Sequence, residues 1–170
     1  MDQKFTIKIA SKGDLPLLEK HLGIKGVPWL HTSKLEDQEK GEGIWLVAWK
    51  KDIPVGYLQV RWTGTKDNAV QKYITHCAHL ETFGVVKDLQ GQGIGTELVK
   101  EAEKLTKEKG FNQIGIAVGS TDNPRARSLY ERLGYTDWGH GDFTTSWEYM
   151  DENGKKGTES EVCVYLLKNL

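Results

Sequence analysis

Three glycines at every second position precede a run of helix-forming residues in DLQGQGIGTEL, from Asp88 to Leu98. A turn of this kind presents unpaired backbone N–H groups at the positive end of a helix dipole, which suits a phosphate ligand. Gly91, Gly93 and Gly95 would let the backbone approach that ligand, because no side chain stands in the way. The stretch predicts either a phosphate site over residues 90–96 or a purely structural tight turn.

The residues after the last glycine narrow the class of ligand. A Walker loop requires a lysine and a hydroxyl residue there, whereas Thr96 and Glu97 follow Gly95, so the loop argues against a nucleoside triphosphatase. The spacing GxGxG also differs from the GxGxxG of a dinucleotide-binding fold, which argues against a Rossmann dehydrogenase.

A second stretch, NPRARSLYERLGY from Asn123 to Tyr135, has the pattern of a short helix. Pro124 is favourable at the first helical position, because it sacrifices no hydrogen bond there, and Gly134 ends the segment. Tyr130 lies on the apolar face of this helix. It either packs there with neighbouring leucines or presents its hydroxyl to a ligand.

The two stretches together resemble the acetyl-CoA-binding motifs of the GNAT N-acetyltransferase superfamily. Gln90-x-x-Gly93-x-Gly95, after a strand that ends in Val85-Val86, is similar to the family's pyrophosphate loop. The segment from Asn123 to Tyr135 resembles the next motif, in which an asparagine opens a helix with a tyrosine on its inner face. The resemblance covers about residues 80–135.

This resemblance implies that acetyl-CoA is the co-substrate and that no metal takes part. The pyrophosphate would bind the loop N–H groups, and the pantetheine arm would lie like an extra strand in a gap of the sheet. Gln90 would offer hydrogen bonds without a charge, and Lys87, Arg125 or Arg127 either supplies the charge or is a solvated surface residue. The residues assigned to the cofactor are Val85, Val86, Gln90, Gly91, Gln92, Gly93, Ile94, Gly95, Thr96, Asn123 and Tyr130.

Two side chains are the candidate catalytic groups. The resemblance implies that Tyr130 hydrogen-bonds the leaving sulfur as general acid, although full proton transfer from a tyrosine to an ordinary thiolate is uphill by roughly 2 kcal/mol. The resemblance also makes Glu81 the first candidate for the base that deprotonates the amine, because family members often carry a catalytic glutamate at this place on the central strand. His79 and His76, on the same predicted strand, are second choices. The alternative for Glu81 is a carboxylate paired with a neighbouring arginine or amide.

The resemblance implies transfer of an acetyl group to a primary amine by direct attack in a ternary complex. A small-molecule amine is the first expectation. The alternatives are a peptide or protein amine, a different acyl group, and a non-catalytic acyl-CoA-binding regulatory module. Acidic and aromatic residues that either receive a cationic amine or belong to the core and surface are Trp29, His31, Glu36, Asp37, Trp138, Asp142, Trp147 and Tyr149.

Hydrophobic periodicity predicts the elements that position these residues. The expected strands cover residues 5–9, 44–49, 55–62, 74–86, 113–118, 143–150 and 162–167, with a turn at 151–159. The expected helices cover 14–22, 94–109 and 123–133, with a further helical piece at 35–39 in an unclear region and a turn at 66–71. The resemblance implies a single α/β (α+β) domain over 1–170, with about seven mostly antiparallel strands and about four helices. Its sheet would splay between strands four and five, with Gly84 as a bulge or a point of close approach.

The composition argues against several other classes of protein. A net charge of -1 and a pI near 6.5 argue against a nucleic-acid partner and against an anionic membrane surface. Cys77 and Cys163 form no metal-ligand pattern, which predicts a reduced chain without a zinc site. No run of 18 apolar residues occurs, so we expect a cytoplasmic protein, with uncovered sheet edges that would support a homodimer.

Overall fold

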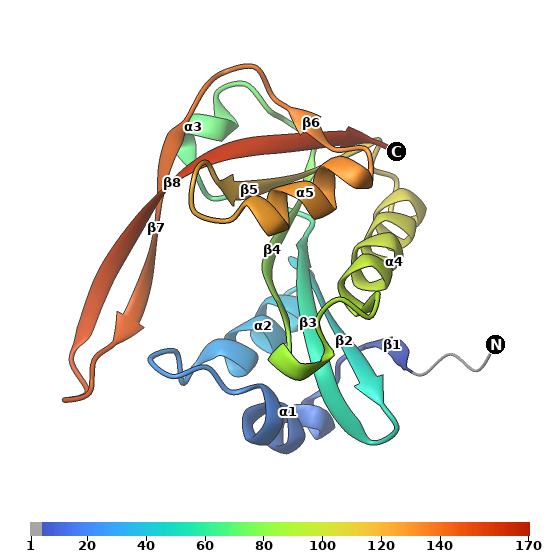
Figure 1. Cartoon of the computed structure of the whole chain (residues 1–170), viewed down its shortest axis with the longest axis vertical. Helices are drawn as coiled ribbons and strands as arrows, with labels where there is room; N and C mark the ends of the chain where they lie inside the picture. The colour runs from blue at the N-terminus through green and yellow to red at the C-terminus, as the bar shows by residue number, and fades with distance from the viewer. Residues whose placement is uncertain (1–4) are drawn as a thin grey trace.

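The computed structural model describes residues 5–170, so the first four residues of the predicted domain lie outside it. Eight strands form one sheet in the order β1-β2-β3-β4-β5-β8-β6, and β7 pairs with β8 (Figure 1). All neighbouring strands are antiparallel except β4 and β5. The strands are β1 Thr6–Ile9, β2 Gly43–Lys50, β3 Ile53–Arg61, β4 Ala78–Val85, β5 Gln113–Gly119, β6 Thr136–Asp137, β7 Phe143–Met150 and β8 Lys156–Asn169. The α-helices are α1 Leu15–Leu22, α2 Leu30–Glu39, α3 Asn68–Gln71, α4 Ile94–Glu108 and α5 Pro124–Arg132.

The mixed, mostly antiparallel sheet is confirmed, and the differences from the predicted elements lie in short or polar segments. β6 has two residues, too few to show a period of two. α2 occupies the unclear region after Gly26 and buries only three side chains, so its amphipathic signal is weak. α3 lies inside the predicted turn. β8 begins at Lys156, within the turn predicted for 151–159, so the last turn is shorter than expected.

β4 begins four residues later than predicted and contains a bulge. The backbone turns at His76, where φ is 49°, and strand pairing starts at Ala78. In the pairing with β3, Gln59 faces Glu81 and Tyr57 faces Gly84. One residue of β3 therefore opposes the two residues 82 and 83 of β4, which leaves an extra residue without a ladder partner.

The predicted close approach at Gly84 is confirmed, because a Cβ there would lie 2.6 Å from the Tyr57 ring. The bulge itself lies before this glycine, at residues 82 and 83. Thr82 adopts a φ of 52°, which is uncommon for a residue with a branched side chain. Strain of this kind is concentrated at functional sites.

The sheet splays between β4 and β5, as expected. The two strands pair only from Ala78 opposite Ile114 to Leu80 opposite Ile116, and then diverge. Below the sheet on one side, α4 and α5 pack against a core that contains Leu98, Ile116 and Tyr130. Beyond Leu80 and Ile116 the facing edges of the two strands are not paired with each other.

The hairpin of β7 and β8 extends beyond the rest of the sheet (Figure 1). Residues 156–163 of β8 pair with β7, and residues 163–169 pair with β5, with β6 on the other edge opposite 166 and 167. At the hairpin tip the amide of Met150 donates to the carbonyl of Gly26, over 2.7 Å, in the connection between α1 and α2. Nearby, the Lys156 ammonium lies 5.2 Å from the Trp29 ring centroid. The hairpin is thus fastened at both ends.

Within residues 5–170, no helix is both long enough and apolar enough to cross a membrane.

Candidate functional site

The glycine loop presents a row of free backbone donors. Gly91 and Gly93 have φ values of 76° and 89°, which side chains disfavour, and Gly93 is the N-cap of the 15-residue α4. The amides of residues 91–96 donate no hydrogen bond to any group of residues 5–170. These donors point from a helix N-terminus, where negative charge is stabilised.

Gly95, the third glycine of the loop, is required for a different reason. A Cβ on Gly95 would lie 2.8 Å from the ring of Phe83, which belongs to the bulge of β4. Gly95 therefore lets α4 pack closely on β4, whereas the sequence argument assigned all three glycines to the approach of a ligand.

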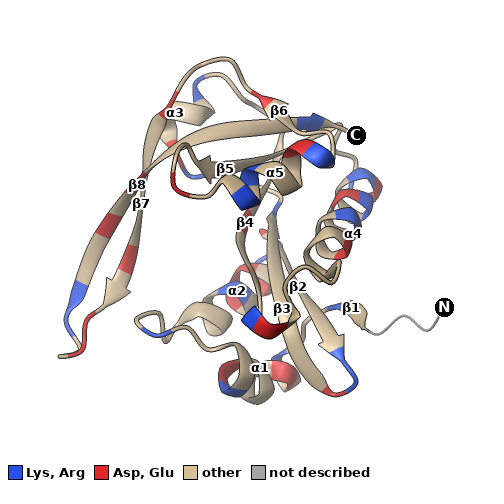
Figure 2. Ribbon diagram, in the orientation of Figure 1, with Lys and Arg blue, Asp and Glu red and all other residues tan. Residues whose placement is uncertain are grey.

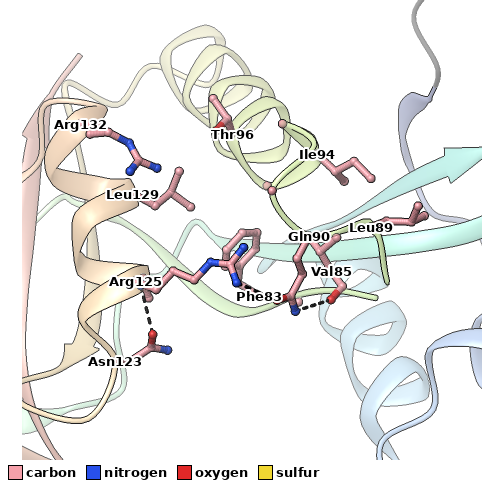
Figure 3. A pocket seen from close by; sticks show the side chains of 15 residues that line it. Phe83, Val85, Leu89, Gln90, Ile94, Thr96, Asn123, Arg125, Leu129 and Arg132 are labelled. Carbon is pink, nitrogen blue, oxygen red and sulfur yellow. Dashed lines mark hydrogen bonds between the residues drawn. The ribbon is translucent and has the colours of Figure 1, made fainter. Parts of the chain in front are cut away.

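A cavity of about 300 Å³, named here the loop cavity, lies over these amides (Figure 3). Its only charged lining side chains among the described residues are Arg125 and Arg132, and no carboxylate lines it. Arg125 Nη1 donates to Gln90 Oε1 over 3.2 Å, and Gln90 Nε2 donates to the Val85 carbonyl over 3.0 Å. The positive charge beside the loop thus comes from α5. The lining residues are Phe83, Gly84, Val85, Leu89, Gln90, Gly91, Gly93, Ile94, Gly95, Thr96, Asn123, Arg125, Ala126, Leu129 and Arg132.

Most residues predicted to bind the cofactor line the loop cavity, and three do not. The amide of Val86 donates to the Val55 carbonyl over 2.9 Å, and the side chain of Gln92 reaches the Asp88 carbonyl. Tyr130 lines a second cavity instead. Asn123 accepts from the Ala126 amide over 3.1 Å, so it also caps α5. The remaining predicted residues in the loop cavity are Val85, Gln90, Gly91, Gly93, Ile94, Gly95 and Thr96.

The second cavity, named here the gap cleft, has a volume of about 490 Å³ and lies where β4 and β5 diverge. It adjoins the loop cavity, because both are lined by Phe83, Asn123 and Ala126. Five separate parts of the chain supply its walls: the loop before α3, β4, β5, α5 and the hairpin. Its lining residues are Thr65, Lys66, Asp67, His79, Leu80, Glu81, Thr82, Phe83, Ile116, Ala117, Val118, Gly119, Asn123, Ala126, Tyr130, Thr145, Ser146, Trp147, Glu161 and Cys163.

Tyr130 contributes a buried hydroxyl to the gap cleft. Its side chain is 1% exposed, and its hydroxyl has no hydrogen-bond partner within residues 5–170. Burial raises the pKa of Tyr130, so this hydroxyl keeps its proton at neutral pH. A buried donor without a partner is unfavourable unless a ligand satisfies it.

Glu81 lines the same cleft and is held by two cations. Its Oε1 lies 3.5 Å from Nε of Arg61 and 3.6 Å from Nζ of Lys34. The pairing expected as the structural alternative is therefore present, while the side chain remains 31% exposed on the cleft wall. Burial lowers the pKa of Lys34, and the nearby Glu81 carboxylate opposes that shift.

The two histidines proposed as second choices for the base lie in different places. His79 lines the gap cleft, where burial lowers its pKa to about 4 and its Nδ1 lies 3.0 Å from the Tyr165 hydroxyl. This ring is a weak base at neutral pH. His76 stacks on Phe111 and lines a separate cavity, so the prediction that it shares the site is wrong.

Among the eight side chains suggested for the acceptor, only Trp147 lines the gap cleft. His31 is buried, with Nε2 3.0 Å from the Leu22 carbonyl, and Asp37 pairs with Arg61 over 3.1 Å. The acidic residues that do line the cleft besides Glu81 are Asp67 and Glu161. Sequence reasoning missed both, since neither belongs to a motif.

The two cysteine thiols are buried and unpaired. Burial raises the pKa of both Cys77 and Cys163 to about 12, so neither is a thiolate at neutral pH. Residues 5–170 contain no group of three or more His, Cys, Asp or Glu side chains arranged to hold a metal ion.

Comparison with known proteins supports the similarity found in the two motifs. A family model described as the acetyltransferase (GNAT) family matches residues 16–135. Thialysine N-epsilon-acetyltransferase of Bos taurus is 37% identical over 59 residues, which cover 35% of this chain and 34% of that protein. This match therefore spans about a third of that relative's length.

Solved structures match the whole fold. The ribosomal-protein-alanine N-acetyltransferase from Brucella melitensis has a TM-score of 0.67 at 20% identity and covers 97% of this chain and 99% of that chain. A GNAT family acetyltransferase from Elizabethkingia anophelis with acetyl-CoA bound has a TM-score of 0.62 at 18% identity, over 99% and 100% of the two chains.

Proposed function

Because the chain belongs to the GNAT acetyltransferase family, we propose that it transfers the acetyl group of acetyl-CoA to a primary amine of a small molecule. The observation that carries this proposal is the junction of the two cavities. Free amides and arginines line the loop cavity, and carboxylates line the adjoining gap cleft. The Tyr130 hydroxyl, which has no hydrogen-bond partner within residues 5–170, also lines the gap cleft.

The loop cavity fits the diphosphate of acetyl-CoA. The amides of residues 91–96 and the guanidinium of Arg125 would hold its negative charge. The gap between β4 and β5 would take the pantetheine arm, because the ladder between these strands stops after Leu80. When bound, acetyl-CoA supplies the thioester that is attacked.

The side chains of the gap cleft would carry the transfer. Glu81 takes a proton from the amine, the nitrogen attacks the thioester carbonyl, and the carbon–sulfur bond breaks. Tyr130 donates a hydrogen bond to the departing sulfur. Because burial raises its pKa further above that of a thiol, we assign it this donation and not full proton transfer. Through water, the released thiolate takes the second proton, which the nitrogen loses as the amide forms.

Direct attack is favoured over an acetyl-enzyme intermediate. An intermediate requires an activated nucleophile, and Cys163, the thiol that lines the cleft, is protonated because burial raises its pKa to about 12. Direct attack predicts intersecting lines in double-reciprocal plots with varied acetyl-CoA and amine, whereas an acetyl-enzyme predicts parallel lines.

The hairpin favours a small acceptor. Its tip is fastened to the connection between α1 and α2 by the Met150–Gly26 hydrogen bond and by a Lys25–Glu152 ion pair of 3.2 Å. An extended polypeptide laid across this side of the sheet would have to displace these contacts. A peptide amine remains the second candidate, because the Brucella melitensis neighbour is named for a protein substrate.

The test is release of free thiol from acetyl-CoA, measured with a panel of small amines and with peptides that carry a free N-terminus. We expect turnover with small amines and loss of that turnover in Tyr130→Phe. Modification of peptides or proteins alone would overturn the small-molecule assignment. Binding of acetyl-CoA with no turnover on any amine would favour a regulatory acyl-CoA binder.

A further inference from the structure

The gap cleft contains more negative charge than its own cations neutralise. Its charged lining side chains are Lys66, Asp67, Glu81 and Glu161. Glu81 is paired with Lys34 and Arg61, as described above. Asp67 and Glu161, in contrast, have no lysine, arginine or histidine nitrogen within 4.0 Å among residues 5–170. These two carboxylates are available to an external cation.

Asp67 is fixed in position by hydroxyl groups. Its Oδ2 accepts from Thr65 Oγ1 over 3.1 Å and from Thr145 Oγ1 over 3.3 Å, which ties the loop before α3 to β7. Its other oxygen, Oδ1, accepts no hydrogen bond from the part of the chain that the structure describes. One oxygen therefore orients the carboxylate, and the other remains free for a ligand.

Glu161 is positioned by the hairpin and by β5. It lies directly opposite Thr145 in the β7–β8 ladder, so both side chains project from the same face. A Cβ on Gly119 would collide with its carboxylate, and the glycine thus provides the space that the carboxylate occupies. Glu161 and Asp67 both contribute to the raised pKa of Cys163, so both carboxylates lie near that thiol.

The same hairpin face continues as an acidic and aromatic surface. Trp147 lies opposite Glu159, one alternation beyond Thr145 and Glu161, and the Trp147 side chain is 42% exposed. Figure 2 shows acidic residues on both hairpin strands: Glu159 and Glu161 of β8 project from this face, whereas Glu148 of β7 projects from the other. A carboxylate beside the face of an indole ring favours an organic cation over a neutral group.

A separate observation indicates that a ligand enters the cleft. The Tyr130 hydroxyl has no partner within residues 5–170 although its side chain is 1% exposed, and it lines the same cavity as Asp67 and Glu161. In the proposed reaction, the thioester sulfur accepts from Tyr130 and the reacting amine contacts Glu81. Neither group contacts Asp67 or Glu161. These two carboxylates are placed to bind a second positive charge.

We propose that the acceptor is a small amine with a second cationic group, which Asp67 and Glu161 bind while the reacting amine lies between Glu81 and Tyr130. Asp67 and Glu161 are then specificity-determining residues, because they select a dication over a monocation of equal length. This inference rests on the proposed function, since it names the class of acceptor for the same site.

The test compares diamines with monoamines of matched chain length. Putrescine and cadaverine, with butylamine and pentylamine as their counterparts, are assayed as acceptors by thiol release. We expect higher kcat/KM for the diamines. In Asp67→Asn and Glu161→Gln, the KM for the diamines rises about tenfold while kcat changes little, since these residues bind the acceptor without touching the reacting atoms. The monoamine KM stays unchanged.

Glu108→Gln is the matched control, because Glu108 is exposed near the end of α4 and lines neither cavity. We expect it to behave as the unmodified chain. Glu161 forms no ion pair within the described residues and no hydrogen bond to the loop before α3, so Glu161→Gln keeps the test valid even where Asp67→Asn weakens that loop. Thermal unfolding of each variant verifies folding.

The two levels of failure are distinguishable. Absence of turnover on every amine, including monoamines, would contradict the proposed function itself. Equal kcat/KM for diamines and monoamines, or an equal rise in KM for both classes in the variants, would overturn the dication inference and leave the acetyltransferase assignment intact.

Discussion

The loop cavity and the gap cleft adjoin, yet different chemical groups line them. The loop cavity presents backbone amides and two arginines, and no carboxylate lines it among the described residues. The gap cleft presents side chains from five parts of the chain, with three carboxylates, one lysine and the buried Tyr130 hydroxyl. A site of backbone amides needs glycine at fixed spacing, whereas a site of side chains needs only that the fold bring them together.

Tyr130→Phe tests the junction of the two cavities and should have the largest effect. We expect kcat to fall by about 10²- to 10³-fold, because the departing sulfur loses its hydrogen-bond donor. Calorimetry should find the affinity for acetyl-CoA nearly unchanged. Tyr135→Phe is the control, since Tyr135 is also buried, at 2% exposure, but lines neither cavity. Normal turnover in Tyr130→Phe would refute the assignment.

Acid pH should affect the gap cleft more than the loop cavity. The folded pKa of His79 is about 4, below its ordinary value of 6.5, because burial disfavours the charged ring. The unfolded chain therefore binds more protons between these pH values. The contribution of His79 to the free energy of unfolding is fully present above pH 6.5 and is lost as the pH drops toward 4. The loss from this residue is at most about 3 kcal/mol.

Urea unfolding across this pH range measures the effect. His79→Gln should flatten the dependence of the free energy of unfolding on pH, because glutamine does not titrate. Parallel curves for the two proteins would show that another group controls the acid sensitivity.

Gly93→Ala tests the backbone site alone. A left-handed conformation costs a non-glycine residue about 1–2 kcal/mol, so the loop amides should reorient and the Kd for acetyl-CoA should rise about tenfold. The KM for the amine should not change. Gly110→Ala is a control at the other end of α4, where φ is 101° and nothing lies within 4 Å of a Cβ. An equal loss of affinity in both variants would point to general destabilisation.

Arg125→Gln should have the smallest effect. Removing this charge from the loop cavity should weaken acetyl-CoA binding about threefold to fivefold and reduce its dependence on salt, because an exposed ion pair contributes up to about 1 kcal/mol. Arg127→Gln is the control, since Arg127 lines neither cavity and pairs with Glu131 over 2.8 Å. An unchanged salt dependence in Arg125→Gln would place the phosphates elsewhere.

The loop cavity could be predicted from the sequence because its chemistry is local. Gly91 and Gly93 require positive φ, and Asn123-Pro124 opens the neighbouring helix, so both motifs lie in short continuous stretches. The role of Gly95 could not be predicted, because it depends on contact with Phe83 from another strand. The same limit hid the bulge at Thr82, which appears only in the register with β3.

The gap cleft could be predicted only in part. Glu81 and Tyr130 were found through the resemblance, but Asp67 and Glu161 come from segments far apart in the sequence that meet only when the hairpin folds over the sheet. His76 is a second-choice base in the sequence argument because the predicted strand 74–86 contains it, whereas β4 starts only at Ala78. The turn that precedes β4 instead directs its ring onto Phe111.

The most direct test of the account is calorimetric titration of the unmodified chain with acetyl-CoA and with CoA. We predict one binding site per chain, with affinity reduced in Gly93→Ala and unchanged in Glu161→Gln, because the loop amides hold the diphosphate whereas Glu161 binds the acceptor. The absence of measurable binding to either molecule would contradict the claim that the amides before α4 hold a coenzyme diphosphate.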